Sequence, residues 1–302
     1  MKIFNLIVTY NRAPMLEKVL CTLSESGYKN IIVINNASTD HTNQVLENNL
    51  SSFDIAEVVT SDVNLGGAGG FALAMRRFVE ISSDDAVAVL HDDDSWPSFN
   101  LESLEQSLSG KSDILGCFPV LHPDGILNAM NIPGVARFIE NPLSYLSMRL
   151  SGKVRRPRVL DEFKNFQSFD YCSFVGFVIS RNLIVNHGVV SDKFFIYSDD
   201  TTYTYLLSKR AGRIGLIGSG NLTFTHDCKR STGKTLLEGN FANYSVRNKV
   251  IFFRLCSHYS YLFIVIFITQ SLIAAPKQAR LIFKSALEGL RVNKADYGLV
   301  DV

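Results

Sequence analysis

Three consecutive aspartates, Asp92-Asp93-Asp94, follow an apolar run at residues 86–90. A short run rich in Ala and Val is typical of a strand that is buried on both faces of a sheet. Open α/β sheets carry their ligand chemistry at the carboxyl ends of such strands. Adjacent carboxylates repel one another, and a divalent cation, which prefers oxygen ligands, would cancel that repulsion. The run therefore predicts a metal or phosphate site, with a solvated acidic loop as the alternative.

The composition of the chain is that of a globular protein. Its 302 residues are 46% hydrophobic and 20% charged, which allows a large core. The net charge of +1 creates no overall field that would attract nucleic acid. The five cysteines show no CxxC spacing, which argues against a zinc site and against a disulfide framework. Because no signal-peptide pattern is visible at the N-terminus, we expect a cytoplasmic protein.

The first 95 residues alternate between short apolar runs and helical patterns. In the first helical pattern, apolar residues recur about every 3.6 positions, and Gly27 follows as a stop signal. The resulting βαβαβαβ order predicts an α/β fold with a mostly parallel central sheet and helices on both faces. The expected strands are 3–8, 31–34, 56–60 and 86–90, and the expected helices are 15–24, 40–48 and 69–81.

Residues 96–238 are less regular. We expect residues 130–165 to form loops, and the basic stretch at 153–158 to be a solvated surface or a contact with an anionic substrate. The expected helices here are 101–108 and 201–210, and the expected strands are 114–118, 174–179 and 221–225. Together with the first 95 residues they would form one domain, 1–238, followed by a small C-terminal helical region, 239–302.

The C-terminal region contains a long uncharged stretch at residues 259–275. A helix that spans a bilayer needs about 20 apolar residues, and this stretch also includes several polar side chains. The pattern therefore favours a core helix or a helix in the membrane interface. The basic residues that follow would suit anionic lipid headgroups: Lys277, Arg280, Lys284, Arg291 and Lys294. Peripheral membrane contact through 255–294 and a subunit contact in a homo-oligomer both remain open.

Four polar segments follow the expected parallel strands and should converge on one edge of the sheet. One of them is rich in glycine, which lets backbone amides approach an anion at the start of a helix. It lacks the G-x-G-x-x-G pattern and follows the third strand, which argues against dinucleotide binding. The four segments are 9–12, 35–40, 64–70 and 92–94.

Two later features would supply the groups that a metal-assisted transfer needs. Asp199 and Asp200 open an expected helix, where a carboxylate can act as a general base or cap the helix. His226 follows an expected strand and could join the aspartates as a ligand for Mn²⁺ or a similar ion. A lone histidine is otherwise more often a structural residue.

Taken together, these segments resemble family 2 glycosyltransferases, the inverting nucleotide-sugar enzymes of GT-A fold. The glycine-rich segment and the triple Asp look most like the galactofuranosyl- and rhamnosyltransferase branch. The resemblance implies a GT-A catalytic domain at 1–238, with a nucleotide-binding half at 1–95 and an acceptor-binding half at 96–238. It is carried by seven segments: 8–12, 35–40, 64–71, 92–94, 194–200, His226 and 244–248.

The resemblance implies a donor-binding role for nine positions. Thr9, Asn11 and Arg12 would line the nucleotide pocket. Asn35 stands where the family usually has an Asp, and its amide oxygen would still accept the ring N–H of the base. The remaining donor-binding positions, which would contact the ribose, sugar or diphosphate, are Asn64, Gly66, Gly67, Asp92 and Asp93.

The resemblance also implies the catalytic groups. Asp94 and His226 would hold a divalent cation, Mn²⁺ or Mg²⁺. Asp200 would be the base that deprotonates the acceptor hydroxyl, and Asp199 would orient hydroxyl groups. The family often has an acidic residue and an arginine further along this helix, where this chain has Thr202 and Leu206.

The implied activity is metal-dependent, inverting transfer of a sugar to a hydroxyl of a glycan or lipid-linked saccharide in cell-surface polysaccharide synthesis. UDP-galactofuranose is the first choice of donor, and dTDP-rhamnose is the alternative. A non-catalytic saccharide-binding protein on the same fold is a weaker alternative. A nucleotidyltransferase is disfavoured because residues 9–12 do not form a basic glycine-rich loop.

Overall fold

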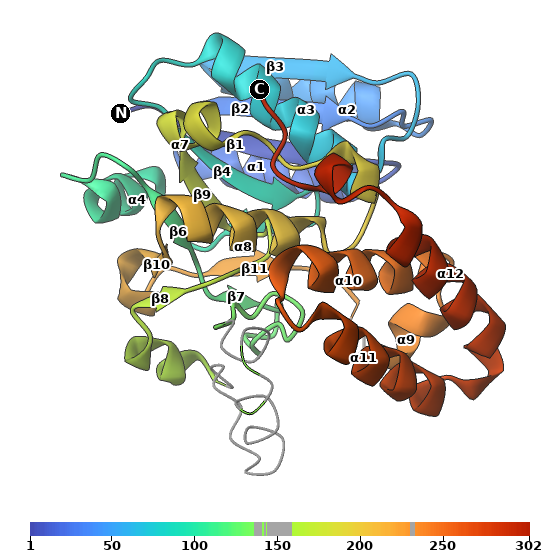
Figure 1. Cartoon of the computed structure of the whole chain (residues 1–302). Helices are drawn as coiled ribbons and strands as arrows, with labels where there is room; N and C mark the ends of the chain where they lie inside the picture. Colours follow the sequence, from blue (N-terminus) through green and yellow to red (C-terminus); the bar gives the residue numbers. More distant parts are fainter. Residues whose placement is uncertain (136–140, 142, 144–158, 230–232) are drawn as a thin grey trace.

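The computed structural model describes residues 1–135, 141, 143, 159–229 and 233–302. Within this part, the chain forms an eight-stranded sheet of order β3-β2-β1-β4-β9-β6-β10-β8 and a small sheet of order β5-β11-β7. The basic stretch at 153–158 and most of the expected loop at 130–165 lie outside the described residues. Figure 1 shows the large sheet beside a group of C-terminal helices.

The first half of the sheet confirms the predicted βαβ order. Its four strands are parallel, because each is connected to the next through a helix that crosses over a face of the sheet. The strands are β1 (Ile3–Thr9), β2 (Asn30–Asn35), β3 (Ile55–Thr60) and β4 (Val87–Asp92). The helices are α1 (Ala13–Glu25), α2 (Thr42–Asn49) and α3 (Gly66–Ile81).

Two boundaries differ from the prediction, and both concern the polar segments. The expected glycine-rich loop is largely the first turns of α3, which begins at Gly66 rather than at Gly69. Strand β4 continues through His91 to Asp92, because these residues pair with Ile7 and Val8 of β1. The first Asp of the triplet therefore belongs to the strand itself, and its backbone position is fixed by the sheet.

The second half of the large sheet mixes directions. Strand β9 (Phe177–Ser180) lies antiparallel between β4 and β6. It begins later than expected because Phe177 N donates to Phe174 O in a turn. The other strands are β6 (Leu115–Cys117), β8 (Ser168–Phe169) and β10 (Ile214–Leu216). The helices are α4 (Leu101–Leu108), α7 (Arg181–His187) and α8 (Asp199–Ala211).

The small sheet consists of β5 (Ser95–Pro97), β7 (Val120–Leu121) and β11 (Phe224–His226). It joins the segment after the triple Asp to the segment that contains His226. Short 3-10 helices complete the described chain: Leu50–Ser52, Leu160–Asn165, Asp192–Phe194, Ile217–Gly220, Pro276–Gln278 and Lys294–Tyr297.

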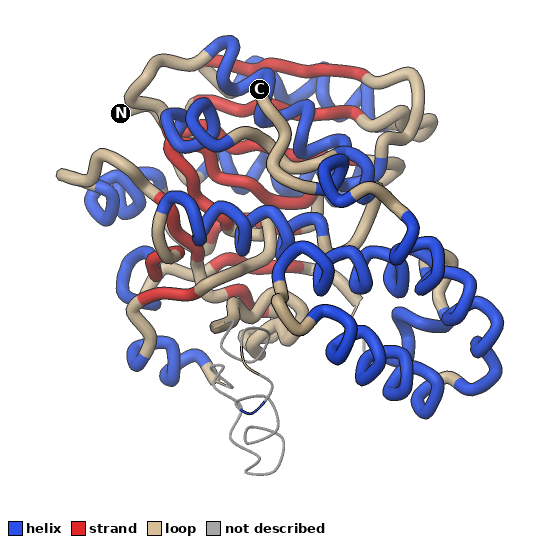
Figure 2. The backbone as a smooth tube through the Cα atoms, viewed as in Figure 1, coloured by secondary structure: helices blue, strands red, loops and turns tan. Residues whose placement is uncertain are grey.

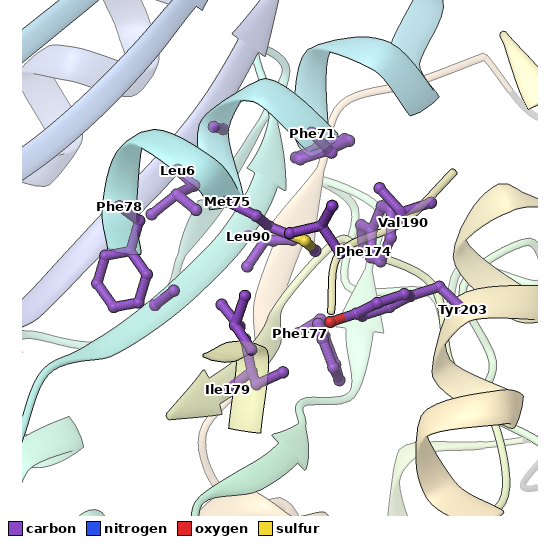
Figure 3. Packing of buried hydrophobic residues seen from close by; sticks show 14 of the residues in the cluster. Leu6, Phe71, Met75, Phe78, Leu90, Phe174, Phe177, Ile179, Val190 and Tyr203 are labelled. Atoms are coloured by element: carbon purple, nitrogen blue, oxygen red, sulfur yellow. The ribbon is translucent and has the colours of Figure 1, made fainter. Parts of the chain in front are cut away.

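Apolar side chains cover both faces of the large sheet, as alternation along the strands requires. On one face, Leu6 of β1 and Leu90 of β4 belong to a cluster with Met75 and Phe78 of α3 and Tyr203 of α8. Figure 3 shows this packing. On the other face, α1, α2 and α4 cover the strands. Because both faces of the sheet are packed, the strands hold their polar ends at fixed positions.

The C-terminal helices form a third apolar cluster beside the sheet (Figure 2). They are α9 (Gly233–Glu238), α10 (Ala242–Cys256), α11 (Ser260–Ala274) and α12 (Ala279–Arg291). Among the described residues, no single helix is long and apolar enough to cross a bilayer. Helix α11 and residues 276–291 reach the required length and hydropathy only as a pair, and the chain bends by 118° between them.

Candidate active site

Asp92, Asp94 and His226 come together as a potential metal-binding group. Asp92 ends β4, and pairing of His226 with Ser95 in the small sheet brings the imidazole next to the triplet. One ligand atom from each residue lies within 4.8 Å of the others. Nε2 of His226 is 3.0 Å from Oδ1 of Asp94 and 4.0 Å from Oδ2 of Asp92. The structure thus adds Asp92 to the predicted pair of ligands.

The donor set suits a divalent cation such as Mn²⁺. It combines two carboxylates with one imidazole, which is the chemistry that such ions accept. Oδ1 of Asp94 is buried and accepts no hydrogen bond of good geometry, so it is available to a cation. Burial raises the pKa of Asp94, but its contacts with His226 and Arg12 together outweigh burial and hold the pKa below its usual value. The carboxylate is therefore ionised and ready to act as a ligand.

Arg12 balances part of the negative charge. Its Nη1 lies 3.2 Å from Oδ1 of Asp93 and also contacts Oδ2 of Asp94. Asp93 accepts a further hydrogen bond from the N–H of Tyr10 at 3.3 Å. Burial raises the pKa of Asp93 to about 7 and that of Asp92 to about 6. The triplet is thus held by charge pairing across the ends of β1 and β4, with more negative charge than Arg12 alone can neutralise.

Asp199 and Asp200 follow a turn with an uncommon backbone. Phe195, Tyr197 and Ser198 all have positive φ, at 65°, 68° and 61°. Non-glycine residues in this region cost free energy and cluster at functional sites. The side-chain N–H₂ of Asn248 lies 2.9 Å from Phe194 O, 2.7 Å from Ile196 O and 3.0 Å from Tyr197 O. Asn248 of α10 therefore stabilises the turn that positions the two carboxylates.

A cavity of about 830 Å³ joins the two acidic groups. Asp92 and His226 line it together with Asp199 and Asp200, and Gly67 of α3 contributes to the same wall. Burial raises the pKa of Asp200 to about 6, and the neighbouring Lys249 works against this shift. A carboxylate with such a pKa can accept a proton from a substrate at neutral pH. The arrangement places a candidate base and two of the three candidate cation ligands on the wall of one cavity.

The predicted donor-binding residues fall into two groups. Gly67 and Asp92 line the cavity. The other seven lie outside its wall, at or after the carboxyl ends of β1 to β4: Thr9, Asn11, Arg12, Asn35, Asn64, Gly66 and Asp93. The structure therefore gathers the predicted positions along one sheet edge, as expected from the parallel order.

Several of these residues also shape the loops. Oδ1 of Asn11 accepts the N–H of Thr39 at 2.7 Å, which links the segments after β1 and β2. The buried Asn35 accepts from Ser38 N at 3.1 Å and donates to Asn43 Oδ1 at 2.7 Å. These bonds give Asn35 a structural role within its loop. Contact between Asn35 and a nucleotide base stays a prediction.

Asn64 also has a structural role, because its side chain forms hydrogen bonds at the start of α3. Its Oδ1 accepts the N–H of Gly66 at 2.8 Å and a side-chain N–H of Asn36 at 3.1 Å. Thr202 and Leu206 stand where the family often has an acidic residue and an arginine, and both have structural roles here. The hydroxyl of Thr202 donates to Ser198 O, and Leu206 packs against the apolar cluster of the C-terminal helices.

Sequence reasoning missed three polar residues near the site. Asn131 contacts His226, with 2.8 Å between Oδ1 and Nδ1. Asn131 lies in an irregular segment that carries no motif. Asn248 belongs to a segment that carries the family resemblance, but an asparagine at this position did not indicate a role. Lys249 lines the cavity next to it, and a basic residue on a helix is usually a solvated one.

Comparison with known proteins identifies the architecture. Residues 6–184 match the family model described as "Glycosyl transferase family 2". A search of curated proteins gave no match. Among solved structures, S. aureus TarS 1-349 superposes with a TM-score of 0.52 at 14% identity, over 96% of this chain and 81% of that chain. The same protein in complex with UDP superposes with a TM-score of 0.51 at 12% identity, over 95% of this chain and 90% of that chain.

A second relative comes from Pyrobaculum calidifontis. The mannosyltransferase PcManGT, in complex with GDP-Man and Mn²⁺, superposes with a TM-score of 0.54 at 13% identity, over 98% of this chain and 77% of that chain. At these identities the likeness concerns the fold. It places the mixed α/β sheet and the adjoining helices described above among GT-A structures.

Proposed function

Because the chain belongs to glycosyl transferase family 2, we propose that it moves a sugar from a UDP-linked donor to an acceptor hydroxyl, with inversion at the anomeric carbon. The observation that carries the proposal is the shared cavity, whose wall includes Asp92 and His226 as well as Asp199 and Asp200. A displacement of this kind needs a charge-neutralising site and a base within reach of one substrate complex. The residues proposed for both roles line one cavity, which supports the proposal.

Asp92, Asp94 and His226 would hold the divalent cation, Mn²⁺ or Mg²⁺. When bound, the cation neutralises the charge that develops on the departing diphosphate. Arg12 reinforces the site because it keeps Asp93 and Asp94 in place through its ion pairs. The chain itself therefore supplies the ligands and their orientation.

Asp200 would take the proton from the acceptor hydroxyl while the oxygen attacks the anomeric carbon. The oxygen–carbon bond forms as the bond to the diphosphate breaks, and the proton ends on the Asp200 carboxylate. General-base assistance of this kind is worth about 10²–10⁴-fold in rate. Asp199 would orient hydroxyl groups of the sugar or the acceptor. Asn248 supports both carboxylates through the turn that precedes them.

The donor-binding positions along the sheet edge would hold the nucleotide: Thr9, Asn11, Arg12, Asn35, Asn64, Gly66, Gly67, Asp92 and Asp93. Our first choice of donor is UDP-galactofuranose, which rests on the likeness of the glycine-rich segment and the triple Asp to that branch. A dTDP-rhamnose donor is the second choice. Among the structural relatives, TarS was solved with UDP and PcManGT with GDP-Man and Mn²⁺.

We place the nucleotide-binding half at 1–95, the acceptor-binding half at 96–238 and the helical region at 239–302. The acceptor would be a glycan or a lipid-linked saccharide of a cell-surface polysaccharide. The proposed location is the cytoplasm, at the inner face of the membrane, with contact through 255–294. A homo-oligomeric contact through the same helices is the alternative, and light scattering of the purified protein would distinguish the two.

Calorimetric titration tests the proposal directly. The protein is titrated with UDP, dTDP and GDP, each with and without Mn²⁺. Metal-dependent binding of UDP supports the site and favours a UDP-hexose, whereas a preference for dTDP shifts the donor to rhamnose. If no nucleotide binds in the presence of Mn²⁺, the chain is a non-catalytic protein on this fold and the proposed transfer is wrong.

A further inference from the structure

The cavity that contains Asp200 extends into the C-terminal helices. Its wall there is predominantly apolar and comes from α9, α10 and α11. Rings of α10 and α11 lie against each other in this wall, with 6.2 Å between the ring centroids of Phe253 and Phe267. The apolar lining residues are Leu236, Leu237, Phe252, Phe253, Phe267 and Ala274.

This wall is a poor partner for a sugar. Saccharide hydroxyls lose hydrogen bonds to water when they are buried, and aliphatic and phenyl groups cannot replace them. Four polar residues interrupt this wall: Ser245 and Lys249 of α10, and Gln270 and Ser271 of α11. Nζ of Lys249 lies 4.4 Å from the centroid of the Phe252 ring, at the side of the cavity where its charge acts on Asp200. Lys249 thus serves the reacting end, and the larger apolar share of the helical end suits a hydrocarbon chain.

The outer side of α11 is largely apolar, with Thr269 as an exposed polar residue on it. Tyr261, Val265 and Ile273 are 75%, 61% and 77% exposed, and their four- and eight-residue spacing places them along one side of the helix. Phe283 and Leu287 of α12 are exposed as well. Three exposed basic residues accompany them on or just before α12: Lys277, Arg280 and Lys284. Apolar side chains combined with basic ones are typical of helices that lie on an anionic lipid surface.

We propose that the apolar wall binds the hydrocarbon part of an amphipathic acceptor while the acceptor's hydroxyl reaches Asp200. The proposal rests on the proposed glycosyl transfer and selects a lipid-linked saccharide over a free glycan. Helix α11 would contact the lipid surface with one side and the hydrocarbon chain of the acceptor with the other. The continuity of the wall with the cavity of Asp200 and the exposed side of α11 both support this assignment.

The test uses alkyl β-D-glucopyranosides with one head group and different chains, below their micelle concentrations. Binding of the methyl, hexyl and octyl compounds is measured by calorimetry in the presence of UDP and Mn²⁺. Each methylene that leaves water strengthens binding about four-fold, so we expect the octyl compound to bind about 15-fold more tightly than the hexyl compound. Equal binding of all three compounds would overturn the proposal.

Two substitutions locate the binding site. Ala274→Trp fills the wall and Ala274→Asp places a charge in it, and Ala274 is itself exposed, so neither change opens the core. Both should abolish the dependence on chain length. The matched control is Thr269→Trp, on the same helix at an exposed position outside the cavity wall, and it should retain the dependence. Retention in both Ala274 variants would place the hydrocarbon elsewhere and refute the proposal.

UDP binding separates this inference from the proposed function. If each variant and the unaltered protein bind UDP with Mn²⁺ equally, a missing chain-length dependence in the unaltered protein refutes only the hydrocarbon site. If the unaltered protein binds no UDP, the proposed transfer fails first, and the acceptor assignment fails with it.

Discussion

Nδ1 of His226 lies 2.8 Å from the side-chain oxygen of Asn131. An amide oxygen can only accept a hydrogen bond, so Nδ1 must carry a proton. The side-chain nitrogen of Asn128 also approaches Nδ1, but at 3.5 Å it is at the limit of a hydrogen bond. Nε2 is therefore the nitrogen that faces Asp94 and would bind a metal. Outer partners of this kind orient histidine ligands and tune their basicity.

Asn131 is not one of the proposed metal ligands, but its replacement should still weaken metal binding. We expect Asn131→Ala to lower Mn²⁺ affinity by about 10–100-fold, because the imidazole loses the acceptor that fixes its orientation. Asn131→Asp retains an acceptor oxygen and should stay near the affinity of the unaltered protein. Electron paramagnetic resonance of free Mn²⁺ gives the affinity. Unchanged affinity in the Ala variant would show that the imidazole is oriented by other contacts.

Loss of His226 itself should have a larger effect on the same measurement. His226→Ala removes one of the three ligands, so metal-dependent nucleotide binding should weaken more than in Asn131→Ala, whereas nucleotide binding without metal should be unchanged. Titration of UDP with and without Mn²⁺ checks both parts. If Mn²⁺ affinity equals that of the unaltered protein, His226 is not a ligand.

Asp200 should be required for transfer but not for donor binding. Asp200→Ala removes the proposed base, so the transfer rate should fall by about 10²–10⁴-fold, with UDP affinity nearly intact. Release of UDP from a UDP-sugar in the presence of acceptor measures the rate. Asp54→Ala, which changes an exposed carboxylate just before the amino end of β3, at the opposite edge of the sheet from the site, is the control. Full activity without the Asp200 carboxylate would remove this residue from the mechanism.

The transfer rate should also fall at low pH, because burial raises the pKa of Asp200. Burial raises its pKa to about 6, and only the ionised form can accept a proton. The rate should therefore be constant above this pH and fall about tenfold for each pH unit below it. An exposed aspartate, with a pKa near 3.9, would keep its activity to a lower pH. Rates at saturating Mn²⁺ test this, and a constant rate down to pH 5 would contradict it.

The sequence predicted the parallel half of the sheet because each strand and helix there has its own periodicity. It also predicted the place of the triple Asp, because parallel order brings strand ends to one edge. The roles expected of Asp200 and His226 came from the family resemblance and not from the strand order. The role of Asn131 could not be predicted. Its contact with His226 joins residues 95 positions apart through an irregular segment, and no local pattern marks such a pairing.

The start of α3 was placed too late for a related reason. Glycine has low helix propensity, so a run of glycines indicated a loop. The contacts that make these residues helical come from the turn before Asp199, which lies far along the chain. The N–H of Ala68 donates to Phe195 O at 3.1 Å, and this tertiary bond outweighs the local preference.

That turn makes Gly66 the glycine most sensitive to substitution in this segment. Its φ is +72°, and a Cβ there would lie 2.1 Å from Phe195 O, so neither the backbone conformation nor the space admits a side chain. Gly66→Ala should cost at least about 1–3 kcal/mol of unfolding free energy and displace the turn that carries Asp199 and Asp200. Gly67→Ala is the matched control for stability, because a Cβ at Gly67 meets nothing within 4 Å. Urea unfolding of both variants gives the comparison, and equal stability would mean that Phe195 can move aside at no cost.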